Sequence, residues 1–489
     1  MSTIPLLLPI ELWHERLFTG HWQPGMKPPT AVTEPSTGSE LGRVGNADIG
    51  QVSRASQNAR EAQKNWYEQH YDERAAVFRK AAQLAEMHFD EIVDWLVRET
   101  GSTRTKANYE MSLTLKALRE SSSLPSSQQG QVLPSTPGRL SIARRRPMGV
   151  VGVISPFNFP LYLGMRAVAP ALATGNAVVL KPDPRTTISG GFVLARLFES
   201  AGLPAGLLHV LPGGKDIGAA LTSDPHIAMI QFTGSTNAGR QIGEAASRHL
   251  KKVSLELGGK NSLIILDDAD LDQAISNTAW GCYLHQGQIC MSSGRVLVQR
   301  KIYDKFLTKL VAKAKTLTVG DPAKENVALG PLINAEQRDR VNKLIQAAQQ
   351  AGARVETGGQ YDGLFFQPTV LTGVTAENPI FHEEVFGPIA IVVPFDTDEE
   401  AIQMANNTEY GLSAAILSNN VGRALKLGEQ LQVGLLHIND QTVNEEAINP
   451  LGGVGISGNG SSIGGTANWE TFTQWQWLTL KEKAPTYLL

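Results

Sequence analysis

The chain has 489 residues, of which 42% are hydrophobic and 19% are charged, and its formal net charge is -3. This length accommodates two or three domains with an ample core, and the small net charge gives no reason to expect nucleic acid or an anionic membrane as a partner. Two cysteines, Cys282 and Cys290, exclude a disulfide framework, lack the spacing of a zinc site and are typical of a reducing compartment such as the cytoplasm.

The N-terminal quarter is predicted to be mostly helical. The apolar run 4–13 has no basic leader and contains two prolines, so we interpret it as a packing arm and not as a signal peptide. Over 48–120, apolar residues recur at spacings of three and four, which predicts helices. A Ser-, Pro- and Gln-rich connection over 121–139 precedes extended chain that carries three arginines, 144–146, interpreted as a solvated strand edge.

From residue 149 short β-rich runs alternate with helical patterns. The first series of runs is GVVGVI, AVVLKP, LLHVL, IAMIQF and KVSLEL, and a second alternation extends from about 295 to 439. Strand–helix–strand repetition predicts parallel sheets with helices on both faces, and ligands bind such sheets at the carboxyl ends of the strands. No stretch is apolar enough to predict a membrane span. The tail after 470 alternates like an exposed strand, which predicts a partner strand and hence a homo-oligomer.

The stretch HQGQIC, residues 285–290, places Cys290 directly after a polar loop. A free thiol has a pKa of about 8.5 and is mostly protonated at neutral pH, so a nucleophilic cysteine needs a lowered pKa or a base that accepts its proton. His285 is one candidate base, although a lone histidine beside a loop is more often only a hydrogen-bonding residue. Cys282 lies in the apolar helical context AWGCYLHQ and is expected to be inert.

Three further polar residues follow predicted strands or precede turns. Glu256 ends the run KVSLEL just before two glycines, so its carboxylate can reach a crevice, unless it is a surface or capping residue. Glu384 in HEEVFGP precedes a tight turn, where two adjacent acids can also be a solvated pair. Asn158 in SPFNFP follows a strand, and its amide either donates to a developing oxyanion or makes an Asn-type turn.

Six motifs in order resemble the signature blocks of the NAD(P)-dependent aldehyde dehydrogenase superfamily. They are SPFNFP, GNAVVLKP, FTGS, LELGGKN, GQIC and EEVFGP, and the resemblance runs from about residue 30 to 480. HQGQIC, LPGG and HINDQTVNEE are most similar to bacterial aromatic-aldehyde enzymes of the benzaldehyde and vanillin dehydrogenase type.

The resemblance implies an α/β fold with two doubly wound parallel-sheet domains and a small β arm. The implied Rossmann-like cofactor-binding domain comprises 1–124, 149–257 and 451–469, and the catalytic domain comprises 258–450. Segments 125–148 and 470–489 would form the oligomerisation arm of a homodimer or homotetramer.

The resemblance also implies a mechanism. Cys290 would attack the aldehyde carbon to form a thiohemiacetal, with the Asn158 amide and the Cys290 backbone N–H holding the oxyanion. Hydride transfer to the nicotinamide would leave a thioester, which water activated by Glu256 would hydrolyse to the carboxylic acid. Relatives that transfer the acyl group to coenzyme A typically lack a base at the position of Glu256, so hydrolysis is favoured.

The cofactor expected from the resemblance is NAD or NADP. In GSTNAG, 234–239, a helix begins after a strand and can present N–H groups to the pyrophosphate, whereas a G-x-G-x-x-G match at 453–458 lacks that context and is interpreted as chance or loop use. Family members that prefer NAD often carry a glutamate where this chain has Pro184, so we expect NADP to be tolerated as well as NAD. The implied cofactor contacts are Ser155, Pro156, Phe157, Lys181, Pro182, Asp183, Gly234, Ser235, Gly239, Leu257, Glu384 and Phe386.

A flat apolar pocket suits an aromatic aldehyde. Its candidate lining is Phe159, Tyr162, Trp280, Ile289 and Met291, residues that could equally pack the core. Other hypotheses are an aliphatic or semialdehyde dehydrogenase of the same superfamily, a cysteine hydrolase or acyltransferase that uses Cys290 and His285, and a non-catalytic binding protein.

Overall fold

The computed structural model describes residues 5–127 and 129–487, so the first residue of the apolar run 4–13 lies outside the described part. Within that run Leu7, Leu8 and Trp13 are buried, and the Glu91 carboxylate accepts hydrogen bonds from the N–H groups of Leu7 and Leu8. The interpretation of this run as a packing arm is confirmed for the described residues.

The first half of the chain forms a seven-stranded sheet in which five consecutive strands are parallel and the last two, at one edge, are antiparallel. These five are the strands predicted from the first alternation. In spatial order the strands are β11 (Lys252–Glu256), β10 (Met229–Thr233), β7 (Val150–Ile154), β8 (Ala177–Lys181), β9 (Leu208–Val210), β1 (Arg16–Phe18) and β2 (Trp22–Pro24).

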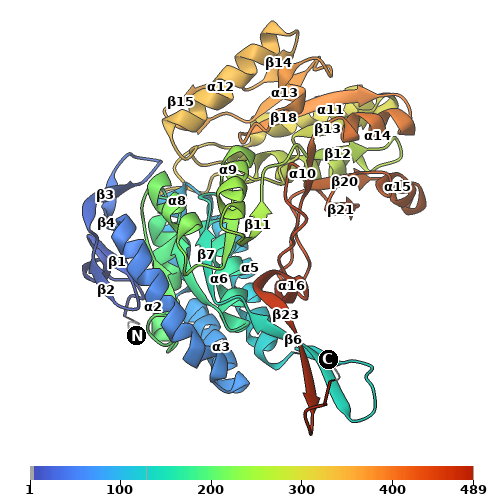
Figure 1. Cartoon of the computed structure of the whole chain (residues 1–489). Helices are drawn as coiled ribbons and strands as arrows, with labels where there is room; N and C mark the ends of the chain where they lie inside the picture. Colours follow the sequence, from blue (N-terminus) through green and yellow to red (C-terminus); the bar gives the residue numbers. More distant parts are fainter. Residues whose placement is uncertain (1–4, 128, 488–489) are drawn as a thin grey trace.

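Helices cover this sheet on both faces, and Figure 1 shows them in blue to green. The helix α2 begins with a capping box in which the Asp48 side chain accepts from the N–H of Gln51, which is the usual signal for a helix start. The helices are α1 (Ile10–Trp13), α2 (Ile49–Glu68), α3 (Tyr71–Met87), α4 (Phe89–Thr100), α5 (Arg104–Ser123), α6 (Pro160–Ala173), α7 (Val193–Ser200), α8 (Lys215–Ser223) and α9 (Thr236–Ser247). A hairpin of β3 (Lys27–Thr33) and β4 (Glu40–Asn46) and the short turns η1 (Leu124–Ser126) and η2 (Ile188–Phe192) complete this half.

The second half forms another seven-stranded sheet, parallel except for one edge strand. In spatial order its strands are β14 (Arg354–Thr357), β17 (Thr369–Thr372), β18 (Ile389–Phe395), β13 (Arg295–Gln299), β12 (Ser262–Ile265), β20 (Ser413–Leu417) and β21 (Leu435–Ile438). Its helices are α10 (Leu271–Tyr283), α11 (Arg300–Thr316), α12 (Ala335–Gln350), α13 (Pro379–His382), α14 (Asp398–Asn406) and α15 (Val421–Gly428). Short pieces are η3 (Leu284–Gly287), β15 (Tyr361–Asp362), β16 (Phe365–Phe366), β19 (Tyr410–Gly411), β22 (Val454–Gly455) and α16 (Ala467–Phe472).

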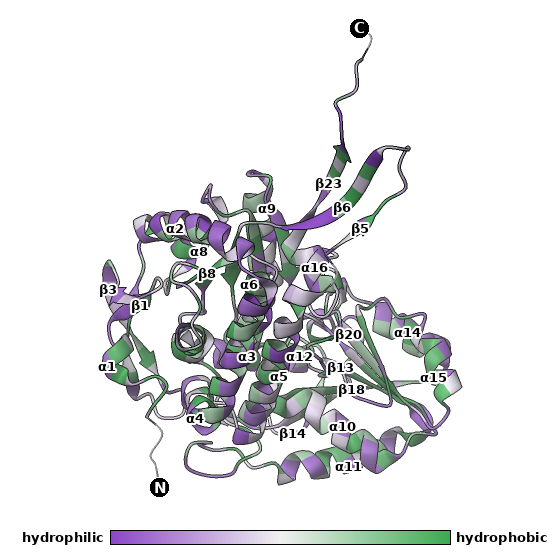
Figure 2. Ribbon diagram, turned by 90° about the horizontal axis from the view of Figure 1, so that it is seen from below, coloured by the Kyte–Doolittle hydropathy of each residue, from purple (hydrophilic) through white to green (hydrophobic). Residues whose placement is uncertain are grey.

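A three-stranded arm projects from the body of the molecule (Figures 1 and 2). It consists of β5 (Gly130–Val132), β6 (Arg139–Pro147) and β23 (Thr473–Lys481) in the order β23-β6-β5. The expected sheet shared by the segment 125–148 and the C-terminal tail is therefore present. Trp475, Trp477 and Leu480 of β23 are exposed.

The interpretation of the three arginines of β6 as a strand edge was wrong, because β6 is the middle strand of the arm. Arg144 donates to the Gln476 side chain, and the Arg145 guanidinium lies 3.6 Å from the centroid of the Trp475 ring. Arg146 lies over the ring of Tyr67. One of the two strands that pair with β6 is β23, which comes from the other end of the chain. Local sequence therefore could not show that β6 has a neighbouring strand on both sides.

Among the described residues, no helix combines the length and the apolar character needed to cross a bilayer.

Candidate active site

Cys290 follows a loop that has an unusual and well-anchored backbone. His285, Gln286 and Gly287 all have positive φ angles, of 50°, 56° and 67°. Such conformations persist in non-glycine residues only where the surroundings hold them. Here the Gln286 amide donates to the carbonyls of Gly101, over 3.1 Å, and Pro331, over 2.6 Å. The buried Gln286 side chain therefore anchors this loop and fixes the backbone that leads to Cys290.

The main chain at Cys290 is tied to the second sheet by Asn261, a residue that the sequence did not single out. The Asn261 amide nitrogen donates to the carbonyls of Cys290 and Ser292, both over 2.8 Å, and its oxygen accepts from the N–H of Ser413. Asn261 follows β11 by a few residues, so it links the strand end at Glu256 to the Cys290 loop. The LELGGKN motif contained it, but only the fold shows which carbonyls it holds.

Cys290 and Glu256 line the same cavity, although 33 intervening positions separate them in the sequence. Glu256 is the last residue of β11, at the carboxyl end of a parallel strand, where ligands bind in such sheets. The rest of the lining is mostly apolar, with one charged pair. It comprises Leu163, Arg166, Gln231, Thr233, Leu257, Leu412, Glu445, Leu451 and Ile463.

The Glu256 carboxylate is buried, and neither oxygen has a hydrogen-bond partner within the described chain. Burial raises the pKa of Glu256 to about 8, and the positive charge of Arg166 opposes part of that rise. A carboxylate with both oxygens free and a pKa close to neutrality has the properties of a general base.

Burial also raises the pKa of the Cys290 thiol to about 12, with further contributions from the negative charges of Glu384 and Glu256. The surroundings of Cys290 thus do not lower the pKa of its thiol, which leaves acceptance of the proton by a base as the second way to obtain a thiolate. Burial raises the pKa of Cys282 to about 12 as well, but this thiol lies outside the cavity and donates to the carbonyl of Ser293 over 3.3 Å.

The charged pair in this cavity is Arg166 with Glu445, both almost fully buried. Arg166 lies on α6 and also donates to the carbonyl of Asn449 over 3.3 Å. Neither residue was singled out from the sequence. The available signal was an arginine within the otherwise apolar helical pattern LYLGMRAVAPALAT, because charged residues are rarely buried without a partner.

Asn158 follows β7 and lies two residues before the first residue of α6. It is buried, its backbone carbonyl accepts from Lys106 over 2.6 Å, and its side-chain amide makes no hydrogen bond to another described residue. The alternative of an Asn-type turn is thus not supported, because such a turn uses the side chain in a local hydrogen bond.

The residues expected to bind the adenosine part of a cofactor gather at the end of β8. Lys181 is buried, which lowers its pKa, and its ammonium donates to the carbonyl of Pro182 over 3.2 Å. The Asp183 carboxylate is engaged by Arg185, which donates from Nε over 2.8 Å and from Nη2 over 2.7 Å. Arg185 also lies 4.1 Å from the centroid of the Phe157 ring. The negative charge of Asp183 is therefore paired with the positive charge of Arg185.

The helix α9 begins as expected from GSTNAG. Ser235 is its N-cap, accepting from the N–H of Ala238, and the N–H of Gly234 donates to the carbonyl of Glu256. A side chain at Gly239 would lie 2.4 Å from Leu257, so glycine is needed for α9 to pack beside the end of β11. Next to them, Ser155 follows β7, and its hydroxyl has no partner among the described residues.

Glu384 lies against the two glycines that follow Glu256. Its carboxylate accepts from the N–H of Gly259 over 3.1 Å, and a Cβ at Gly258 would lie 2.6 Å from that carboxylate. Burial raises the pKa of Glu384 to about 7. Phe386 has a φ angle of 55°, and its ring meets that of Phe157 edge to face at 5.9 Å. This contact joins the loop after β7 to the segment before β18.

Four of the five candidate substrate-pocket residues, namely all but Tyr162, belong to one apolar cluster that packs against Cys290. Tyr162 lies in the core of the first half of the molecule, and none of the five lines the cavity that holds Glu256. His285 is buried, with its ring against Phe159 and its Nδ1 3.5 Å from the Ser102 hydroxyl. Burial lowers the pKa of His285 well below its usual value, and it does not line the cavity.

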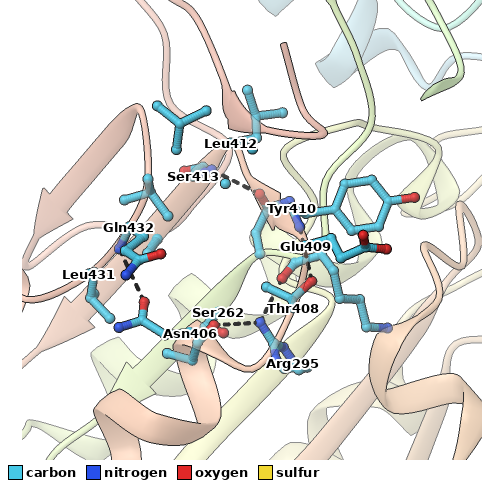
Figure 3. A pocket seen from close by; sticks show the side chains of 18 residues that line it. Ser262, Arg295, Asn406, Thr408, Glu409, Tyr410, Leu412, Ser413, Leu431 and Gln432 are labelled. Carbon is cyan, nitrogen blue, oxygen red and sulfur yellow. Dashed lines mark hydrogen bonds between the residues drawn. The ribbon is translucent and has the colours of Figure 1, made fainter. Parts of the chain in front are cut away.

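A second cavity lies at the amino ends of β12 and β13, and its lining contains neither Cys290 nor Glu256 (Figure 3). Arg295 closes one side by donating to the carbonyls of Met404 and Ala405, both over 2.8 Å, at the end of α14. The guanidinium therefore satisfies orphan carbonyls of a helix terminus, which is a structural role.

These features define an α/β protein built on two sheets of mainly parallel strands. A cysteine and a carboxylate share one mostly apolar cavity, which residues from both halves of the chain line. A model of the aldehyde dehydrogenase family matches residues 22–478, and the chain belongs to that family.

The chain is 52% identical to a vanillin dehydrogenase from an Amycolatopsis strain, covering 96% of this chain and 97% of the relative. It is 46% identical to a benzaldehyde dehydrogenase [NAD(+)] from Pseudomonas putida, covering 97% and 98%. Among solved structures, an NADP-dependent enzyme from Escherichia coli matches with a TM-score of 0.93 and 33% identity over 97% of this chain and 99% of that chain.

Proposed function

We propose that this protein oxidises an aromatic aldehyde to the carboxylic acid with NAD or NADP. The observation that carries the proposal is the shared cavity of Cys290 and Glu256, with leucine and isoleucine side chains around it. The relatives named for vanillin and benzaldehyde, both matched over nearly their full length, support an aromatic substrate. Apolar walls suit an aryl ring, since a flat ring gains most from burial against such side chains.

The residues at the cofactor positions fit a nicotinamide dinucleotide. The unpartnered Ser155 hydroxyl, the buried Lys181 ammonium and the carboxylate of Glu384 beside Gly258 are polar groups that a dinucleotide could contact, although none of the three lines the cavity of Cys290 and Glu256. In this proposal Lys181 and Glu384 hold the two riboses, and the N-terminus of α9 faces the pyrophosphate. The bound dinucleotide would supply the hydride acceptor.

The proposed chemistry begins with transfer of the Cys290 proton to Glu256. The sulfur then bonds to the aldehyde carbon, and the Asn158 amide and the Cys290 N–H donate to the oxygen that becomes negative. After loss of hydride, the acyl group is held on Cys290 as a thioester, and Glu256 releases the proton of the thiol to solvent. Glu256 then takes a proton from water, which attacks the thioester carbon, and returns it to the departing sulfur, so that the acid and the free thiol are released.

A spectroscopic assay tests the proposal. The protein with NAD and benzaldehyde or vanillin should form NADH and the corresponding acid in equal amounts. A panel that includes an aliphatic aldehyde and a semialdehyde tests the substrate class, and the aromatic substrates should give the highest kcat/KM. Hydrolysis of a thioester or ester with no NADH from any aldehyde would instead identify a cysteine hydrolase.

The cofactor preference is expected to be broad. Pro184 supplies no carboxylate to repel a 2′-phosphate, and Asp183 is neutralised by Arg185. We predict that kcat/KM for NAD exceeds that for NADP by less than about a thousandfold, a difference of about 4 kcal/mol. Pro184→Glu is the matched variant, because it restores the repulsive carboxylate and should widen the ratio. A wild-type ratio above about a thousand contradicts the prediction, and a ratio left unchanged by Pro184→Glu contradicts the reason given for it.

The pH dependence of thioester hydrolysis should follow Glu256. A general base must be deprotonated, so the rate should rise with pH through about 8, the pKa to which burial raises this carboxyl. Arg166→Met removes the cation that opposes this rise and should move the profile to higher pH. Glu445→Gln removes the counter-charge of Arg166 and should move the profile to lower pH, each by roughly half a unit to one unit. Shifts of the same sign for both variants, measured by single-turnover hydrolysis, would contradict the assignment.

We further propose that the β5-β6-β23 arm mediates a homodimer or homotetramer. The exposed side chains of Trp475 and Trp477 are apolar surface that a partner strand would cover.

The domain boundaries proposed are 1–124, 149–257 and 451–469 for cofactor binding, and 258–450 for catalysis. The two free cysteines support a cytoplasmic location.

A further inference from the structure

A fully buried ion pair on α5 lies against the segment that carries Asn158. Lys106 and Glu110 are one helical turn apart, both side chains are 0% exposed, and the ammonium donates to the carboxylate over 2.5 Å. Burying two charges is costly unless their remaining donors and acceptors are also satisfied. Neither residue lines the cavity of Cys290 and Glu256, so the pair does not touch the reacting atoms.

The remaining contacts of Lys106 are made with Asn158 and its neighbour. The ammonium donates to the backbone carbonyl of Asn158 over 2.6 Å and lies 4.1 Å from the centroid of the Phe159 ring. A charge-assisted hydrogen bond and a cation–π contact thus act on consecutive residues. Together they restrain the peptide bond between Asn158 and Phe159.

Glu110 holds the other end of the same short segment. The N-cap of α6 is Phe159, which has no side-chain oxygen, so the first N–H groups of this helix need another acceptor. Oε1 of Glu110 accepts from the N–H of Leu161 over 2.9 Å and of Tyr162 over 3.1 Å. A carboxylate from α5 therefore replaces the missing cap and fixes where α6 begins.

We propose that Lys106 and Glu110 are positioning residues that hold the Asn158 amide toward the oxyanion formed at Cys290. The carbonyl of Asn158 and the start of α6 are thus both anchored, which restrains the backbone that carries the Asn158 side chain. Small displacements of such a donor weaken the hydrogen bond in the transition state far more than they affect the binding of substrate or cofactor. The inference rests on the proposed role of Asn158.

The first test is Lys106→Met, together with the double variant Lys106→Met/Glu110→Gln. The double variant leaves no unpaired buried charge, and its glutamine oxygen can still accept from α6, so it serves if the single variant does not fold. The rate constant of the NADH burst at saturating NAD and aldehyde should fall about tenfold or more. The Kd for NAD should change less than about twofold, because the contacts of Lys106 and Glu110 with this segment are made to Asn158 and the residues after it, none of which is an expected cofactor contact. An unchanged burst rate constant overturns the inference.

A double-mutant cycle with Asn158→Ala separates positioning from general damage. If Lys106 acts through Asn158, adding Lys106→Met to Asn158→Ala should change the burst rate constant by less than about twofold. Losses that multiply in the combined variant overturn the positioning role while leaving the role of Asn158 intact. An unaffected burst in Asn158→Ala alone overturns the proposed oxyanion donor, and the positioning role with it.

Glu99→Gln is the matched control. Glu99 is equally buried on the neighbouring α4 and accepts from the N–H groups of Ile188 and Ser189, so it also caps a helical segment, but it does not contact Asn158. Its variant should lower the melting temperature and leave the burst rate constant at saturating substrates within about twofold of wild type. A burst defect as large as that of Lys106→Met would make destabilisation the explanation and overturn the inference.

Discussion

Replacing Cys290 by serine should abolish aldehyde oxidation, with kcat/KM lowered by about a thousandfold or more. A serine hydroxyl is a much weaker nucleophile than a thiol at the same place, and the buried cavity offers no histidine to activate it. The measurement is the initial rate of NADH formation with an aromatic aldehyde. Oxidation at the wild-type rate would show that this sulfur is not the nucleophile.

Cys282→Ser is the control for this variant. Its hydroxyl can still donate to the carbonyl of Ser293, so the local contact is retained. We expect kcat/KM within about twofold of wild type, since the thiol lies outside the cavity. Should Cys282→Ser abolish activity while Cys290→Ser does not, the roles of the two cysteines would be reversed.

Replacing Glu256 by glutamine should stop turnover after the first NADH has formed. Steady-state kcat is expected to fall by roughly a hundredfold or more, the usual contribution of a general base. The burst should still approach one NADH per site. The rate of the burst should also fall, because Glu256 no longer accepts the Cys290 proton. The fall should be smaller than that of turnover, because the substitution also removes one of the negative charges that raise the pKa of Cys290.

Rapid mixing of Glu256→Gln with NAD and aldehyde, followed by acid quenching, measures both parts of this prediction. The acyl group should be recovered on Cys290 as a thioester adduct by mass spectrometry. Undiminished steady-state turnover, or the absence of any burst, would each contradict the assignment of Glu256 to thioester hydrolysis. Arg340→Gln is a suitable control for local damage, because Arg340 is an exposed residue that donates to the main-chain carbonyls of Glu384 and Val385.

Local patterns were sufficient for most of the fold. The apolar runs of β7, β8, β10 and β11 and the helical periodicity of α2 to α4 depend on short-range chemistry, so their positions could be read directly. The arm was also visible as two unusual segments. The central position of β6 was not, because the order of strands in a sheet depends on which distant segment pairs with which edge.

Some residues of the candidate site could likewise be predicted from local sequence, and others could not. Cys290, Glu256, Asn158 and Glu384 could be named from motifs, since each stands in a short stretch whose composition is unusual for its place. The tether by Asn261, the pair Arg166–Glu445 and the pair Lys106–Glu110 were missed. Each depends on contacts between elements that are far apart in the sequence, and no local pattern records such a contact.

The sequence by itself determined the elements, the family resemblance and which side chains are proposed to react. Only the tertiary structure decided the protonation and direction of those side chains, because burial and neighbouring charges set a pKa and hydrogen bonds to remote backbone set an orientation. The raised pKa of the Cys290 thiol, which a polar loop sequence did not suggest, is the clearest case.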